Sequence, residues 1–114
     1  MKLAAIYANL SCSNLDTSTK WFALLFERDP DARPMRGLVE WHHQGNAGFQ
    51  LFEKEQDAGR GTMTLIVENI QAEHARLREA AIKPGDIEKA DYTTIFRLRD
   101  PDGNLVVLAQ PTGA

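Results

Sequence analysis

Three histidines are the residues of this chain that first suggest metal chemistry. His42 and His43 are adjacent, and His74 lies further along in a segment with helical spacing. Successive side chains of a β-strand point to opposite faces, so His42 and His43 cannot bind one ion if their segment is extended. We therefore expect no three-histidine site. His42 and His43 are predicted to lie on a strand surface or pocket rim, and His74 at a helix–sheet interface.

Other candidate reactive groups are isolated. Glu40, Glu53 and Glu68 are possible general bases by residue type alone, because no second carboxylate or histidine stands at an informative spacing. Cys12 is the one cysteine, which excludes an intramolecular disulfide and a cysteine-rich zinc site. It alternates with polar residues on an apolar strand face, so we interpret it as a small core residue. The sequence has no phosphate loop, dinucleotide motif or nucleophile elbow.

The composition is that of an ordinary globular protein. The chain has 114 residues, of which 43% are hydrophobic and 25% charged, and its net charge is −3. Lysine and arginine are scattered rather than gathered in a stripe, so nucleic acid is not an expected partner. No apolar run has the length of a membrane span, and the N-terminus lacks a signal-peptide pattern. We expect a cytoplasmic protein with no membrane partner.

The elements that must position these residues follow from periodicity. Residues 4–13 alternate between apolar and polar, as in a half-buried strand, and Asn14 or Asp16 can cap the helix that follows. The two prolines of residues 29–34 predict a loop, and Gly45 and Asn46 suit a tight turn. The remaining expected elements are strands over residues 36–43, 47–53, 62–67, 87–89, 92–99 and 104–110, and a second helix capped by Asn69.

The chain repeats itself. A shift of 55 residues places Leu10 on Leu65 and Asn14 on Asn69, so strand, cap and helix recur in the same order. We therefore expect one α+β domain over residues 1–114. It contains one unit over about residues 3–55 and a second over about residues 61–111. Each unit buries one sheet face under its helix and leaves the other face open.

Two segments carry a resemblance to a known family. Residues 14–25 (NLDTSTKWFALL) resemble the opening helix of the vicinal oxygen chelate superfamily, and residues 99–108 (RDPDGNLVVL) resemble its closing hairpin. This superfamily includes glyoxalase I, extradiol dioxygenases, fosfomycin-resistance transferases and bleomycin-resistance proteins. The resemblance implies two βαβββ units that form a curved mixed sheet with the helices on its convex side. Because the superfamily hosts several chemistries, it is a weak guide to function.

In catalytic members the resemblance implies a metal held by histidine and glutamate on the concave face. The matching positions of this chain hold Tyr7, Gln50, Thr62 and Val107. None of these is an anion at neutral pH, and Val107 has no donor atom, whereas divalent metals in such sites need imidazoles and carboxylates. The sequence therefore predicts a member without the family metal and without another cofactor.

Strand alternation gives the expected pocket. If Tyr7 faces the concave side, so does Asn9, and Arg97 does so if Phe96 and Leu98 face a helix. Arg97 could then receive a carboxylate, or it is solvated charge at a sheet edge. Trp41 is interpreted either as a pocket wall or as packing. The expected ligand-binding residues are Tyr7, Asn9, Trp41, Gln50, Phe52, Thr62, Arg97 and Val107.

The leading functional hypothesis is a metal-independent homodimer that binds a small organic molecule, as bleomycin-resistance proteins do. One alternative is a metal-dependent glyoxalase-like lyase, isomerase or dioxygenase with non-standard ligands. Another is an accessory protein whose sheet face binds a polypeptide. The sequence leaves open whether the two units pack within one chain or are exchanged between chains.

Overall fold

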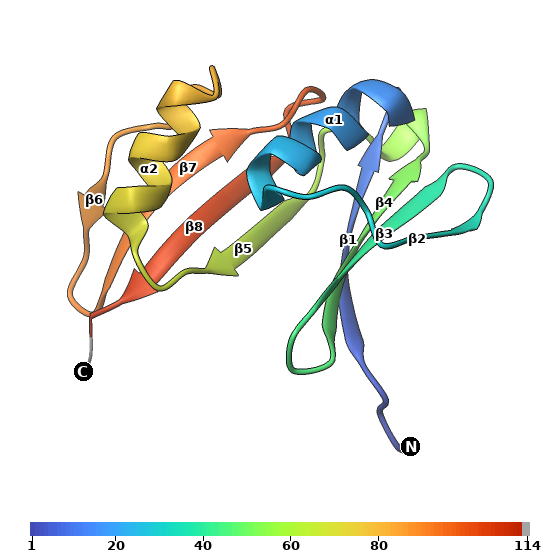
Figure 1. Cartoon of the computed structure of the whole chain (residues 1–114), viewed down its shortest axis with the longest axis horizontal. Coiled ribbons are helices and arrows are strands. Elements are labelled where there is room, and N and C mark those ends of the chain that lie inside the picture. The colour runs from blue at the N-terminus through green and yellow to red at the C-terminus, as the bar shows by residue number, and fades with distance from the viewer. Residues whose placement is uncertain (113–114) are drawn as a thin grey trace.

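The computed structural model describes residues 1–112 and contains two βαβββ units (Figure 1). The first unit comprises β1 (Ile6–Cys12), α1 (Leu15–Phe26), β2 (Ala32–Met35), β3 (Leu38–His43) and β4 (Ala47–Glu53). A short 3-10 helix, η1 (Glu55–Asp57), joins it to the second unit. That unit comprises β5 (Thr62–Ile66), α2 (Ile70–Glu79), β6 (Glu88–Lys89), β7 (Thr93–Arg99) and β8 (Leu105–Pro111). The expected α+β class and the repeat of two units are confirmed.

The two sheets have the same topology. Their strand orders are β1-β4-β3-β2 and β5-β8-β7-β6. The first strand of each unit runs parallel to the last, and the other neighbours are antiparallel. β1 and β5 are therefore edge strands, and they face one another where the two sheets lie side by side (Figure 1). No helix within residues 1–112 is long and apolar enough to cross a membrane.

Asparagine caps start both helices, as the repeat predicts. The Asn14 side chain accepts a hydrogen bond from the amide of Thr17 at 3.0 Å, and Asn69 accepts one from the amide of Ala72 at 3.1 Å. Each cap satisfies an amide that the first helical turn leaves without a partner. The two units therefore begin α1 and α2 by the same local interaction.

The core lies between the helices and one face of each sheet. Phe22 of α1 packs against Phe49 of β4, with their ring centroids 4.7 Å apart. α2 lies over β7 and β8 in the second unit (Figure 1). The buried apolar residues of both units form one cluster: Leu10, Cys12, Phe22, Leu25, Val39, Trp41, Phe49, Leu51, Met63, Ile70, Leu77, Ile82, Phe96, Leu98, Val106 and Leu108.

The closing hairpin connects the two units. Asn104 is fully buried, and its Nδ2 donates to the carbonyl of Ser11 at the end of β1, at 2.8 Å. Its Oδ1 accepts from the amide of Gly61 just before β5, at 2.9 Å. A Cβ added to Gly61 would lie 2.5 Å from Cδ2 of the buried Leu10, so a larger residue here would force that side chain to shift. The DPDGN segment thus fixes the point where β1 and β5 meet.

The structure differs from expectation at residues 29–34. Part of this predicted loop forms β2, which pairs with β3 through Ala32 and Met35 with a shift of register between them. Pro34 is compatible with a strand here because β2 is at the sheet edge, where a missing amide breaks no ladder. The predicted tight turn is confirmed, since Gly45 and Asn46 both have positive φ angles, of 73° and 59°.

Candidate functional site

The first sheet has an open face, on the side away from the core, that holds four of the expected residues. Tyr7 and Asn9 of β1 alternate with buried Leu10, and Gln50 and Phe52 of β4 alternate with Leu51. Asn9 is paired in register with Gln50, so their side chains point to the same side. These four side chains therefore lie on the face of the sheet that is turned away from the core.

The second sheet has a corresponding open face. Arg97 of β7 is paired in register with Val107 of β8, and Thr62 of β5 follows the same alternation. The neighbours Leu98 and Val106 are buried against the helix side. Arg97 is exposed and forms an ion pair with Glu88 of the edge strand β6. Its guanidinium therefore already has a carboxylate partner within the chain.

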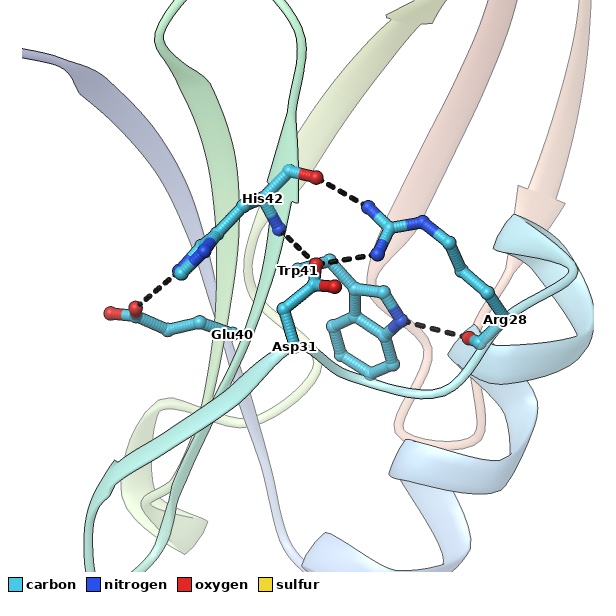
Figure 2. A network of polar contacts seen from close by, with 5 residues as sticks. All are labelled: Arg28, Asp31, Glu40, Trp41 and His42. Carbon is cyan, nitrogen blue, oxygen red and sulfur yellow. Dashed lines mark hydrogen bonds and ion pairs between the residues drawn. The ribbon is translucent and has the colours of Figure 1, made fainter.

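Trp41 is not on an open face. It is fully buried and packs against Phe49, with ring centroids 5.8 Å apart, on the helix side of the first sheet. Its indole nitrogen donates to the carbonyl of Arg28 at 3.0 Å (Figure 2). The expectation that Trp41 could form a pocket wall is therefore not met. Strand parity explains this, because Glu40 and His42 occupy the open face on either side of it.

A chain of hydrogen-bonded side chains, which we call the open-face polar chain, crosses β1, β4 and β3. Asn9 Nδ2 donates to Gln50 Oε1 at 3.3 Å, and Gln50 Nε2 donates to Glu40 Oε2 at 2.7 Å. Glu40 Oε1 lies 3.0 Å from His42 Nε2 (Figure 2). Sequence reasoning did not pair Glu40 with His42. Their i, i+2 spacing on a strand was the available signal, since it places both on one face.

Glu40 is the charged centre of this polar chain. Its side chain is only 13% exposed, while that of His42 is 47% exposed. The hydrogen bond from Gln50, and then that from His42, holds the pKa of the Glu40 carboxyl below its usual value. Glu40 is therefore ionised at neutral pH and accepts hydrogen bonds at both oxygens.

The backbone of His42 is held by an ion pair from the loop after α1. Asp31 Oδ2 accepts from the His42 amide at 2.6 Å, and Arg28 donates to the His42 carbonyl at 2.5 Å (Figure 2). Arg28 and Asp31 also bind each other at 2.5 Å. The hydrogen bond from Arg28, and then that from the His42 amide, lowers the pKa of Asp31. His42 is thus fixed at its main chain while its ring stays accessible.

Gly48 makes room for the aromatic ring of Tyr7. A Cβ at Gly48 would lie 2.9 Å from Cε2 and Cζ of that ring, so the tyrosine lies directly over the glycine. The ring centroids of Tyr7 and His42 are 5.8 Å apart. An aromatic surface therefore borders the histidine end of the open-face polar chain.

The residues at the expected metal positions do not fit a divalent ion. Tyr7 and Gln50 lie on the first sheet, and Thr62 and Val107 on the second, and together they offer no carboxylate or imidazole. Among residues 1–112, no group of three or more His, Cys, Asp and Glu side chains could hold a metal. His42 and Glu40 are a pair already bonded to each other.

A groove of about 780 Å³ separates the two units, and we call it the inter-unit groove. It is lined by Ile6 and Ala8 of β1 and by Leu65 and Ile66 on the β5 side. Ile6 and Ile66 are 68% and 67% exposed, which is unusual for residues of their size and type. None of the eight expected ligand-binding residues lines this groove.

Comparison with known proteins identifies the fold. The sequence matches no protein-family model and no curated protein. The structure is similar to a glyoxalase/bleomycin resistance protein from Catenulispora acidiphila, with a TM-score of 0.86, 20% identity, and coverage of 95% of this chain and 98% of that chain.

Two further solved structures show the range of proteins that share this architecture. TnmS3, an antibiotic binding protein from Streptomyces sp. CB03234, matches with a TM-score of 0.84, 18% identity, and coverage of 97% of this chain and 98% of that one. The oxidase ChaP-H2 matches with a TM-score of 0.79, 10% identity, and coverage of 100% and 98%. These similarities identify the fold rather than the activity. This chain has the fold of the glyoxalase/bleomycin resistance proteins of the vicinal oxygen chelate superfamily.

Proposed function

We propose that this chain is a metal-independent protein that binds a small organic molecule on the open faces of its two sheets. One observation carries the proposal. The positions that hold the metal in catalytic relatives contain no anionic donor, yet the same face keeps an ordered polar chain beside an aromatic ring. Mixed aromatic and hydrogen-bonding surfaces of this kind suit small ligands. The similarity to an antibiotic binding protein agrees with such a role.

The proposed ligand contacts come from both sheets. Tyr7 supplies a flat apolar surface, while Asn9 and Gln50 supply amide groups. Arg97 supplies a cation that a ligand carboxylate could share with Glu88. Phe52, Thr62 and Val107 complete the set, and Trp41 supports β3 from the core side.

We propose that the protein is a homodimer whose second copy covers the inter-unit groove. The groove between the unpaired edges of β1 and β5 exposes Ile6 and Ile66, which a second copy would remove from water.

Substitution of the exposed isoleucines tests the homodimer. Ile6→Glu and Ile66→Glu should each shift the protein toward the monomer, because burial of an unpaired carboxylate is unfavourable. Light scattering during size-exclusion chromatography measures the mass against 12.8 kDa for one chain. Met35→Glu is the control, since Met35 is an exposed apolar residue of β2 outside the groove. A wild type that is monomeric at high concentration would contradict the dimer.

The binding face is tested with a ligand found by screening. The double variant Tyr7→Ala/Arg97→Ala should bind it at least about tenfold more weakly than the wild type, a loss of about 1.4 kcal/mol. Tyr92→Ala/Arg78→Ala is a matched control, because both residues are exposed and lie outside the proposed contacts. If the first double variant binds as tightly as the control, the ligand does not lie on the open faces.

A further inference from the structure

The contact between Glu40 and His42 fixes where the imidazole carries its proton. An ionised carboxylate only accepts hydrogen bonds, and Glu40 receives one from Gln50 and one from His42. His42 Nε2 must therefore carry hydrogen to donate to Glu40 Oε1. In the neutral ring, Nδ1 is then left with an unshared electron pair.

His42 Nδ1 is available to a ligand. Within residues 1–112 no protein group forms a hydrogen bond with this atom, and the side chain is about half exposed. The Tyr7 ring lies beside it, tilted by 58°. A proton acceptor therefore stands next to an aromatic surface on the face where we propose that the ligand binds.

We propose that Glu40 and His42 form a carboxylate–imidazole pair that accepts the proton of a weakly acidic ligand hydroxyl, so that a phenol or enol binds as its anion. This inference rests on the proposed function and names a ligand class for it. The ligand O–H bond breaks and an Nδ1–H bond forms, while the electron pair of the broken bond stays on the ligand oxygen. The reverse transfer on release needs no oxidant, reductant or co-reactant.

The charges around His42 support this direction of proton transfer. Glu40 is the carboxylate bonded to the ring, and it would stabilise an imidazolium formed there. Tyr7 approaches from β1 and is uncharged. Arg28 and Asp31 contact the His42 backbone, but they form an ion pair with each other, and their charges largely cancel. His43 lies on the opposite face of β3, against the Phe26 ring.

A chromophoric probe makes the proton transfer visible. 4-Nitrophenol has separate absorption bands as a neutral phenol and as a phenolate, and 4-nitroanisole is its analogue without an acidic proton. Below the pH at which free 4-nitrophenol ionises, wild-type protein should increase the phenolate band and bind 4-nitrophenol more tightly than 4-nitroanisole. His42→Gln should lose the phenolate band, while His74→Gln, on α2, should keep it.

Glu40→Gln separates the charge of the pair from its shape. The new amide oxygen can still accept from Gln50, and its NH₂ group would then donate to His42 Nε2. That arrangement moves the ring proton to Nδ1, which can no longer accept a proton from the ligand. Glu40→Gln should therefore abolish the phenolate band and lower the ratio of 4-nitrophenol to 4-nitroanisole affinity. Nitrogen NMR of the free protein should show Nε2–H in the wild type and Nδ1–H in this variant.

Each outcome decides the proposal. A phenolate band that depends on both Glu40 and His42 supports it. If the wild type binds both probes equally and only as neutral molecules, or if its ring carries hydrogen on Nδ1, the proton-accepting pair is wrong while the binding function stands. If neither probe binds, the proton-accepting pair is contradicted, while the titration with the screened ligand still decides the proposed binding function.

Discussion

Asn104 is the side chain on which the connection between the two units depends most. It is fully buried, and its amide bonds the Ser11 carbonyl, the Gly61 amide and the Asp100 carboxylate. Asn104→Ala leaves buried polar groups without partners, so we expect the free energy of unfolding to fall by about 3 kcal/mol. Urea denaturation measures this change.

The helix cap Asn69 provides a control for Asn104. Asn69→Ala removes the exposed hydrogen bond that the Ala72 amide donates to the Asn69 side chain. This substitution should lower the free energy of unfolding by only about 1 kcal/mol. Equal effects of the two substitutions would show that the closing hairpin has no special part in joining the units.

The buried thiol of Cys12 should make the stability of the protein fall as the pH rises into the alkaline range. Burial, and then the charge of Asp102, raises the pKa of its thiol to about 11. In the unfolded chain a thiol has a pKa of about 8.5, so the native state holds the proton more tightly. The tighter hold on this proton stabilises the folded state fully below about pH 8.5. The stabilisation is lost as the pH rises toward the pKa of the Cys12 thiol in the folded protein.

The change of stability with pH should therefore differ between the wild type and Cys12→Ala. Between about pH 8.5 and 10.5, the wild type should lose up to about 1.4 kcal/mol per pH unit more than the variant. Urea unfolding at several pH values measures both slopes. Parallel slopes would mean that the folded protein does not bury the Cys12 thiol as described.

At the residue scale, the family resemblance supplied Tyr7 and Gln50 as site positions, and strand alternation added Asn9 to the face of Tyr7. In the structure these three side chains lie on the open face. The same rule could have excluded Trp41, which shares its side of β3 with buried Val39. The link between Glu40 and Gln50 could not be predicted, because it depends on the register of β3 against β4, which is a tertiary property.

At the element scale, the helix starts were predictable and the helix ends were not. An asparagine cap is a local signal, and it operates at both α1 and α2. The left-handed residues that end these helices are Glu27 and Ala81, with φ angles of 60° and 63°. Glycine is the usual residue there, so neither helix end carries the common local signal.

Ala81 offers a substitution expected to stabilise the protein. Its amide and that of Ile82 bond carbonyls in the last turn of α2, at 3.2 and 3.0 Å, so the left-handed conformation is required. Ala81→Gly relieves a backbone strain and should raise the free energy of unfolding by up to about 1 kcal/mol.

The adjacent Ala80 is the control for Ala81. Its φ is −80°, which alanine adopts without strain. Ala80→Gly should therefore lower the free energy of unfolding by about 0.5–1 kcal/mol. Thermal and urea denaturation compare the two variants. A loss of stability in both would contradict the assignment of Ala81 to the end of α2.

At the element scale, the strand β2 could not be predicted from local sequence patterns. Residues 29–34 carry two prolines, which local signals assign to a loop. The strand forms because the segment lies beside β3 at a sheet edge, where proline is tolerated. This position depends on the order of strands in space, which periodicity does not contain.

At the scale of the whole molecule, the repeat of two units was predictable because each unit carries the same sequence of strand, cap, helix and strands. The inter-unit groove was not predictable, because its lining residues come from both units and meet only through the tertiary structure. The proposed second copy follows from the exposure of Ile6 and Ile66, which also required coordinates.

Ligand binding on the open faces is proposed to need no metal. Calorimetric titration with a screened ligand tests it most directly, using protein stripped by a chelator and protein then supplied with nickel, zinc, iron or manganese. We expect equal affinities, within about twofold, because the positions of Tyr7, Gln50, Thr62 and Val107 supply no anionic ligand. Binding that disappears on stripping and returns with one metal ion per site would contradict the claim.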